Sequence, residues 1–139
     1  MDYEVMMNGN VKIGTFAPEF EANSTMGKVS LSDYKGKWLV FFSHPGDFTP
    51  VCTTEIIAFA KVNTYFEKMN TCLLGLSVDS NSSHLAWVYD IYCKTGIVIP
   101  FPILSDKRSK CEIGVGRPWN SLRIRRNSAI NLRDLQIVW

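Results

Sequence analysis

A cysteine at position 52 stands in a setting that favours a reactive thiolate. It follows an apolar run at residues 38–42 and a loop that contains Pro45 and Pro50, which stop a strand and preset a turn. Apolar residues at helical spacing come next, so Cys52 is expected at or near a helix N-terminus. Unpaired N–H groups and the helix dipole stabilise an anion there, and the thiolate is the nucleophilic form of cysteine. The alternative is a buried structural cysteine beside a helix cap.

The neighbours of Cys52 support a nucleophilic role. Thr49 lies three positions earlier, close enough in a tight loop for its hydroxyl to reach the sulfur or an atom bound to it. The two prolines are expected to shield the site and fix its shape. His44 lies in the same loop, where it either fixes the loop or tunes the site.

The pattern Pro45-x-x-x-Thr49-x-x-Cys52 is similar to the active-site motif of the peroxiredoxins, and residues 41–55 resemble the one-cysteine class of that family in particular. The resemblance implies that Cys52 attacks the O–O bond of a peroxide and becomes a sulfenic acid. It implies that Thr49 bonds the peroxide and that Pro45 limits access to the site. It also implies that Glu55, expected in the first helical turn, helps to hold the loop. The alternative for Glu55 is a surface acid near the positive end of the helix.

The elements around the motif are expected to form an α/β fold. Residues 38–42 and 72–78 are apolar runs of strand length, and the second suits a central parallel strand covered on both faces. Residues 79–83 supply caps for a helix at residues 84–94, which Gly96 ends. Strands and helices in alternation indicate a sandwich with a parallel core. The resemblance implies a thioredoxin-like fold, with Cys52 at the carboxyl end of its strand, where such sheets hold ligands.

The remaining parts of the first 106 residues are interpreted as scaffold. Residues 11–20 suggest a short strand and a turn, residues 21–30 a hairpin, and residues 31–37 a helical turn that ends at Gly36. His84 is interpreted as a helix-start residue with a structural hydrogen bond rather than as a base.

The composition changes near residue 106. Residues 1–105 hold seven lysines, no arginine and ten acidic residues, a net charge of −3, whereas residues 106–139 hold two lysines, six arginines and three acidic residues, a net charge of +5. The family resemblance extends over about residues 10–106. We therefore divide the chain into a thioredoxin-like peroxiredoxin domain, residues 1–106, and a divergent basic segment, residues 107–139.

The basic segment is either a divergent ending or the product of a shifted reading frame. Alternating apolar residues near 122–124 and 135–139 make strands possible there, so the segment either completes the sheet or leaves it incomplete. The family's peroxide-site arginine has no clear match. Arg126 and Arg133 are the main candidates, with Arg123 and Arg125 as others.

The four cysteines, at positions 52, 72, 93 and 111, include no C-x-x-C pair. This spacing argues against a zinc site and a thioredoxin-type dithiol, so we expect no metal ion and no cofactor. Cys72 is expected to be a buried apolar residue. Either Cys93 or Cys111 could resolve the sulfenic acid by forming a disulfide. A one-cysteine cycle, completed by an external thiol reductant, fits the motif better.

Composition limits the other functions. With 46% hydrophobic and 20% charged residues the chain is expected to be one soluble domain, and no apolar run approaches the about 20 residues that span a bilayer. The acidic N-terminus does not resemble a signal peptide, so a cytoplasmic location and no membrane partner are expected. Nucleic-acid binding by the basic segment is disfavoured because no binding motif accompanies it.

The resemblance implies a peroxide substrate and a homodimer or larger homo-oligomer. The alternative is an inactive peroxiredoxin-like interaction or holdase protein that lacks a complete peroxide site.

Overall fold

The computed structural model describes residues 17, 19–106, 128–131 and 136–138 of the chain. Its strands are β1 (Glu21–Ser24), β2 (Gly27–Ser30), β3 (Trp38–Ser43), β4 (Thr71–Ser77), β5 (Ile103–Ser105), β6 (Ser128–Asn131) and β7 (Gln136–Val138). Its helices are the 3-10 helix η1 (Leu31–Tyr34) and the α-helices α2 (Pro50–Lys68) and α3 (Asn81–Thr95). The strands form one sheet in the order β2-β1-β5-β4-β3-β6-β7.

The centre of the sheet is parallel. Strand β4 pairs in parallel with β3 on one side and with β5 on the other, while β1 and β6 join as antiparallel neighbours. Helix α2 connects β3 to β4, and α3 connects β4 to β5. The predicted α/β fold with parallel central strands is therefore confirmed. As a result, the carboxyl ends of all three parallel strands lie at one edge of the sheet.

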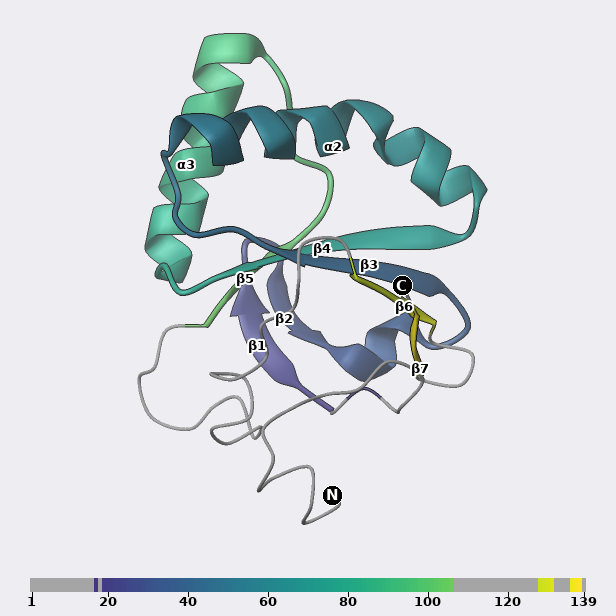
Figure 1. Cartoon of the computed structure of the whole chain (residues 1–139). Coiled ribbons are helices and arrows are strands. Elements are labelled where there is room, and N and C mark those ends of the chain that lie inside the picture. The colour runs from purple at the N-terminus through teal and green to yellow at the C-terminus, as the bar shows by residue number, and fades with distance from the viewer. Residues whose placement is uncertain (1–16, 18, 107–127, 132–135, 139) are drawn as a thin grey trace.

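Side chains alternate between two apolar clusters along the central strands. Helices α2 and α3 cover one face of the sheet, where Phe42 and Leu73 are buried with Trp87 of α3 (Figure 1). On the other face Phe41 and Leu74 are buried with residues of the β1–β2 hairpin and η1. Because successive strand residues point to opposite faces, burial of both faces explains why β3 and β4 are almost continuously apolar.

Local capping sets the ends of the elements. The hairpin of β1 and β2 forms where it was expected, with Gly27 at a φ of 93°. Ser80 caps α3 by accepting a hydrogen bond from the backbone N–H of Ser83, so α3 begins three residues before the predicted start. Gly96 ends α3 in the left-handed conformation, at a φ of 71°.

Two strands from the basic segment extend the sheet. Strand β6 pairs with β3 over Trp38↔Asn131 to Phe41↔Ser128, and β7 pairs with β6. The strand expected at residues 135–139 overlaps β7, whereas the one expected at residues 122–124 lies outside the described residues. Of the segment 11–20, where a short strand and a turn were expected, only residues 17, 19 and 20 are described. The division of the chain at residue 106 stays a prediction. Among the described helices, none combines the length and the apolar character that crossing a membrane requires.

Candidate active site

Cys52 is the third residue of α2, behind the loop that follows β3. Helix α2 begins at Pro50, with Thr49 as its N-cap residue in an extended conformation. Proline suits this first position because the N–H that it lacks would have no helical partner. The Cys52 side chain is only 3% exposed and packs in the cluster that contains Phe42, Ile56 and Leu73. The predicted placement of Cys52 at a helix N-terminus is confirmed.

Glu55 does not lie in the first helical turn, so this part of the prediction is wrong. Because α2 already begins at Pro50, Glu55 falls in the second turn and is exposed. The hydroxyls of Thr53 and Thr54 donate back to the carbonyl oxygens of Thr49 and Pro50, at 2.8 and 2.9 Å. The residues that fix the first turn are therefore these two threonines.

Thr49 and Pro45 lie in the loop at the N-terminus of α2, and both are exposed. The Thr49 hydroxyl donates to the carbonyl oxygen of Gly46 at 2.9 Å. Because its hydrogen is donated to Gly46, the Thr49 oxygen has lone pairs left for a donor such as a peroxide O–H.

Phe48, which lies between Pro45 and Thr49, has a φ of 61°, a left-handed conformation that costs a non-glycine residue about 1–3 kcal/mol. Strain of this kind persists only where the surroundings hold the backbone in place.

A buried carboxylate, that of Asp47, holds this loop. Its side chain is 1% exposed and bonds His44 Nε2 through Oδ1 and His84 Nδ1 through Oδ2, both at 2.7 Å. The Ser83 hydroxyl also donates to Oδ2, at 2.9 Å. His84 is fully buried, and its Nε2 lies 3.0 Å from the carbonyl oxygen of Leu104. The structural hydrogen bond predicted for His84 is therefore present, and His44 has the loop-fixing contact that was one of its two predicted roles.

Asp79 anchors the same loop from the end of β4. Its Oδ2 accepts hydrogen bonds from the Asp47 backbone N–H and the Ser77 hydroxyl, both at 2.9 Å. Burial acts to raise the pKa of Asp79, but these two hydrogen bonds and the nearby imidazoles outweigh it and lower the pKa. The Asp79 carbonyl in turn accepts from Ser105 of β5 at 2.6 Å. The loop before Cys52 is thus tied to the ends of the two neighbouring parallel strands.

His44, Asp47 and His84 offer ligand atoms that all lie within 4.8 Å of one another, so a metal ion must be considered. The carboxylate oxygens are, however, only 2.7 Å from the imidazole nitrogens. Two ligands at about 2.0–2.1 Å from a tetrahedral ion stand roughly 3.3 Å apart. The observed separations are those of hydrogen bonds, so protons rather than a metal ion join these groups.

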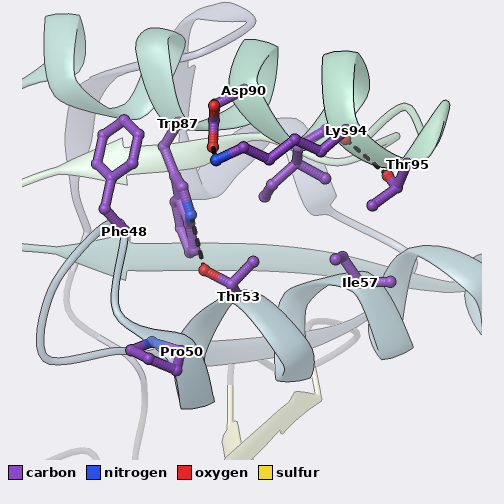
Figure 2. A pocket seen from close by; sticks show the side chains of 9 residues that line it. Phe48, Pro50, Thr53, Ile57, Trp87, Asp90, Lys94 and Thr95 are labelled. Atoms are coloured by element: carbon purple, nitrogen blue, oxygen red, sulfur yellow. Dashed lines mark hydrogen bonds and ion pairs between the residues drawn. The ribbon is translucent and has the colours of Figure 1, made fainter.

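Trp87 links α3 to the first turn of α2. Its indole Nε1 donates to the Thr53 hydroxyl at 3.1 Å (Figure 2). The centroid of its ring lies 4.9 Å from that of His44. A groove of about 230 Å³ runs beside this contact, with the Lys94–Asp90 ion pair of 2.8 Å at its edge. It is lined by Phe48, Pro50, Thr53, Ile57, Trp87, Asp90, Ile91, Lys94 and Thr95.

Replacing Thr53 with valine is expected to lower the free energy of unfolding by about 1–3 kcal/mol, because the buried indole N–H of Trp87 loses its acceptor. Valine keeps the shape of threonine, and Thr53→Ser, which keeps the hydroxyl, is the matched control. Urea unfolding of the two variants tests this. A Thr53→Val protein as stable as the Thr53→Ser protein would show that the indole contact contributes nothing.

Neither of the other two cysteines that the structure describes packs beside Cys52. Cys72 is half-buried on the opposite face of the sheet, beside Tyr34, rather than fully buried as expected. Cys93 is exposed on α3, whose inner face carries His84, Trp87 and Ile91. The pKa of Tyr89 is raised, mainly by its hydrogen bond with Cys93. Cys52, Cys72 and Cys93 are all free thiols. The other sequence candidates lie outside the described residues: Cys111, Arg123, Arg125, Arg126 and Arg133.

Comparison with known proteins identifies the family. Residues 13–126 match the family model described as the AhpC/TSA family. The chain belongs to the AhpC/TSA family. A relative from this family, peroxiredoxin 2 of Caldanaerobacter subterraneus subsp. tengcongensis, is 67% identical over 96 residues, which are 69% of this chain and 43% of the relative. The chain spans about half the length of the curated relatives it matches.

Solved peroxiredoxin structures share the fold. A yeast mitochondrial 1-Cys peroxiredoxin is 35% identical, with a TM-score of 0.77 over 94% of this chain and 66% of that one. A reduced 2-Cys peroxiredoxin of Plasmodium vivax is 31% identical, with a TM-score of 0.70 over 92% of this chain and 85% of that one. The thioredoxin-like fold and the peroxiredoxin resemblance are thereby confirmed. The similar structures thus include a 1-Cys and a 2-Cys peroxiredoxin.

Several residues of the site were not singled out from the sequence. Asp47 stood within the motif, between two prolines, but nothing local showed that its carboxylate would be buried. Asp79 and Ser83 were expected only as helix caps. Their contacts with the loop join residues 32 to 37 positions apart, which a local pattern cannot reveal.

Proposed function

We propose that this chain carries the reactive centre of a thiol peroxidase that reduces hydrogen peroxide and alkyl hydroperoxides. The observation that carries the proposal is the position of Cys52 in the first turn of α2, behind the loop of Pro45 and Thr49, in a chain of the AhpC/TSA family. The first turn of a helix has backbone N–H groups without helical partners, and these can donate to an anion that binds there. The fold places this loop at the carboxyl edge of the parallel strands, where ligands bind.

The proposed reaction is a two-electron oxidation of Cys52. The thiolate attacks one peroxide oxygen, an S–O bond forms, the O–O bond breaks, and the leaving hydroxide or alkoxide takes a proton to become water or an alcohol. The Cys52 sulfur is oxidised to sulfenic acid and the peroxide is reduced. Thr49 accepts a hydrogen bond from the peroxide, since its own hydrogen is donated to Gly46. Pro45 limits access, and His44 either orients the loop or tunes the thiolate.

The proposed peroxide site also requires an arginine. One of Arg126, Arg133 or their neighbours Arg123 and Arg125 must reach Cys52 to stabilise the charge that develops on the peroxide. A preorganised donor of this kind contributes on the order of 10²–10³-fold to the rate in a well-studied hydrolase. The basic segment would then act in the same site as the loop.

We propose an external thiol as the reductant. It attacks the sulfenic sulfur with loss of water to form a mixed disulfide, and a second thiol then releases Cys52 and leaves as part of a disulfide. The outward position of Cys93, on the face of α3 away from the core cluster of Cys52, supports this over an internal disulfide with that residue. The yeast 1-Cys relative is described as resolved through glutathione and thioredoxin systems.

Trapping of the sulfenic acid tests the cycle. After one equivalent of hydrogen peroxide, dimedone is expected to label Cys52 in the full chain and in a Cys93→Ser variant to the same extent, as read by mass spectrometry of peptides. A Cys52–Cys93 disulfide, with labelling only in the variant, would contradict the external-thiol cycle. Oxidation of other cysteines before Cys52 would contradict the proposed function itself.

A homodimer or larger homo-oligomer and a cytoplasmic location complete the proposal, the first because members of the family commonly assemble in this way. The non-catalytic alternative, an interaction or holdase protein without a complete site, is favoured by no observation on the described residues.

A further inference from the structure

Both ring nitrogens of His84 face oxygen atoms that can only accept hydrogen bonds or that carry negative charge. Nε2 lies 3.0 Å from the carbonyl oxygen of Leu104, and a carbonyl has no hydrogen to offer. Nε2 must therefore carry hydrogen. Nδ1 lies 2.7 Å from Oδ2 of Asp47, so a hydrogen is also needed between these two atoms. Either the imidazole is doubly protonated, or the Asp47 carboxyl group is neutral.

The other partners of Asp47 decide between these two states. His44 Nε2 and the Ser83 hydroxyl also point at the carboxylate, at 2.7 and 2.9 Å. Hydrogen bonds donated to a carboxylate favour its ionised form. The shared hydrogen therefore belongs to His84, which becomes a buried cation paired with a buried anion. His84 then has no free lone pair, so it cannot act as a base.

The same count of donors and acceptors determines which ring nitrogen of His44 carries hydrogen. An ionised Asp47 can only accept, so His44 must donate to it from Nε2, while His44 Nδ1 is buried without a hydrogen-bond partner among the described residues. Asp47 also accepts hydrogen bonds from His84 and Ser83, and these fix the position of the carboxylate. The carboxylate in turn fixes the position of the His44 ring. Asp47 lies two residues before Thr49 and five before Cys52, so its position sets that of the reactive loop.

We propose that His84 is a positioning residue of the peroxidase site, which it serves as a doubly protonated imidazole that holds Asp47. This inference rests on the proposed function for its kinetic part. The charged and titratable groups that face His84 are Asp47 from the loop, His44 from the end of β3 and Asp79 from the end of β4. From β5 the group that faces it is the uncharged Leu104 carbonyl. One buried cation is thus balanced by acidic groups on two sides.

The protonation state is tested by NMR of ¹⁵N-histidine-labelled full chain near neutral pH. We expect hydrogen on both ring nitrogens of His84, with Nε2–H alone on His44. A His84 ring with an unprotonated nitrogen would overturn the proposal. This readout is independent of peroxidase activity, so it stands even if the proposed function fails.

Two amide variants test the positioning role. Asparagine at position 84 can place its amide N–H near the site of Nδ1 and keep a donor to Asp47, whereas glutamine can place it near Nε2 and keep only the donor to Leu104. We expect His84→Gln to lower the rate constant for Cys52 oxidation by hydrogen peroxide about 10- to 100-fold, since small displacements of reacting groups cost that much. His84→Asn should lose several times less.

The test depends on which of the two variants, His84→Gln or His84→Asn, has the lower rate constant for Cys52 oxidation. If His84 acted only by filling space or by bonding β5, His84→Gln would react as fast as His84→Asn or faster, and the proposal would be overturned. Far-ultraviolet circular dichroism confirms that the variants are folded, and if either is not, the NMR result decides. A wild-type protein that reacts at the rate of a free thiol would instead reject the proposed peroxidase function and leave the protonation test in force.

Discussion

Serine in place of Cys52 is expected to lower the rate of peroxide consumption by at least about 10³-fold. Loss of the nucleophile in a well-studied hydrolase costs even more, and a serine hydroxyl near neutral pH is not ionised to any useful degree. The hydrophobic cluster around position 52 should be little changed, because serine is slightly smaller than cysteine. Stopped-flow measurement of peroxide consumption, with dithiothreitol as the reductant, gives the rate constants.

Cys72→Ser is the matched control for this experiment. Cys72 lies on β4 and packs on the opposite face of the sheet from Cys52. Its side chain is half-buried. Replacing it with serine should leave the rate of peroxide consumption within about threefold of the wild type, as expected for a residue away from the reacting atoms. Equal losses in both variants would mean that the measured activity comes from general thiol chemistry and not from the loop at the start of α2.

Asparagine in place of Asp47 is expected to lower the free energy of unfolding by about 3–5 kcal/mol, the usual cost of breaking a buried ion pair by removing one partner. The Asp47 carboxylate accepts from two imidazoles and a hydroxyl. An amide at this position has only one acceptor oxygen, and its NH₂ group would face one of the donors. His84 would then be a buried cation without its anion.

Asp90→Asn provides the control for this change. Asp90 pairs with Lys94 on the outside of α3, where an exposed ion pair contributes about 0–1 kcal/mol. Urea unfolding followed by circular dichroism compares the two variants with the wild type. If Asp47→Asn and Asp90→Asn lost similar amounts of stability, the network around Asp47 would not be the main anchor of the loop.

The loop at residues 44–49 shows how far local patterns predict this fold. A strand stopped by Pro45 and a helix that begins at or near Cys52 follow from chain stiffness and the spacing of apolar residues, so Cys52 could be placed from the sequence. Ser80 and Gly96 cap α3 for equally local reasons. The start of α2 was misplaced because Pro50 can be the first residue of the helix, and this moved Glu55 out of the first turn.

The interior of the site could not be predicted in this way. Asp47, Asp79 and His84 meet because three strands end at one edge of the sheet, and the sequence pattern of each residue alone is compatible with exposure. Whether the Asp47 carboxylate is buried depends on the groups that surround it, and two of these, Ser83 and His84, come from α3. Burial and pairing are properties of the assembled sheet, so they appear only in the structure.

The polar contacts of the site also bear on the order in which the chain folds. The bonds from Asp47 to Asp79, Ser83 and His84 span 32 to 37 residues, and that from His84 to Leu104 spans 20. The hydrogen bond from the Ile103 N–H to the Thr25 hydroxyl joins the hairpin region to β5 and spans 78 residues. Since closing a longer loop costs more chain entropy, the segment from β3 to β5 can organise as one cooperative unit before β1 docks beside it. During synthesis, the reactive loop would then be held in place as soon as β5 has emerged, before β6 and β7 have been synthesised.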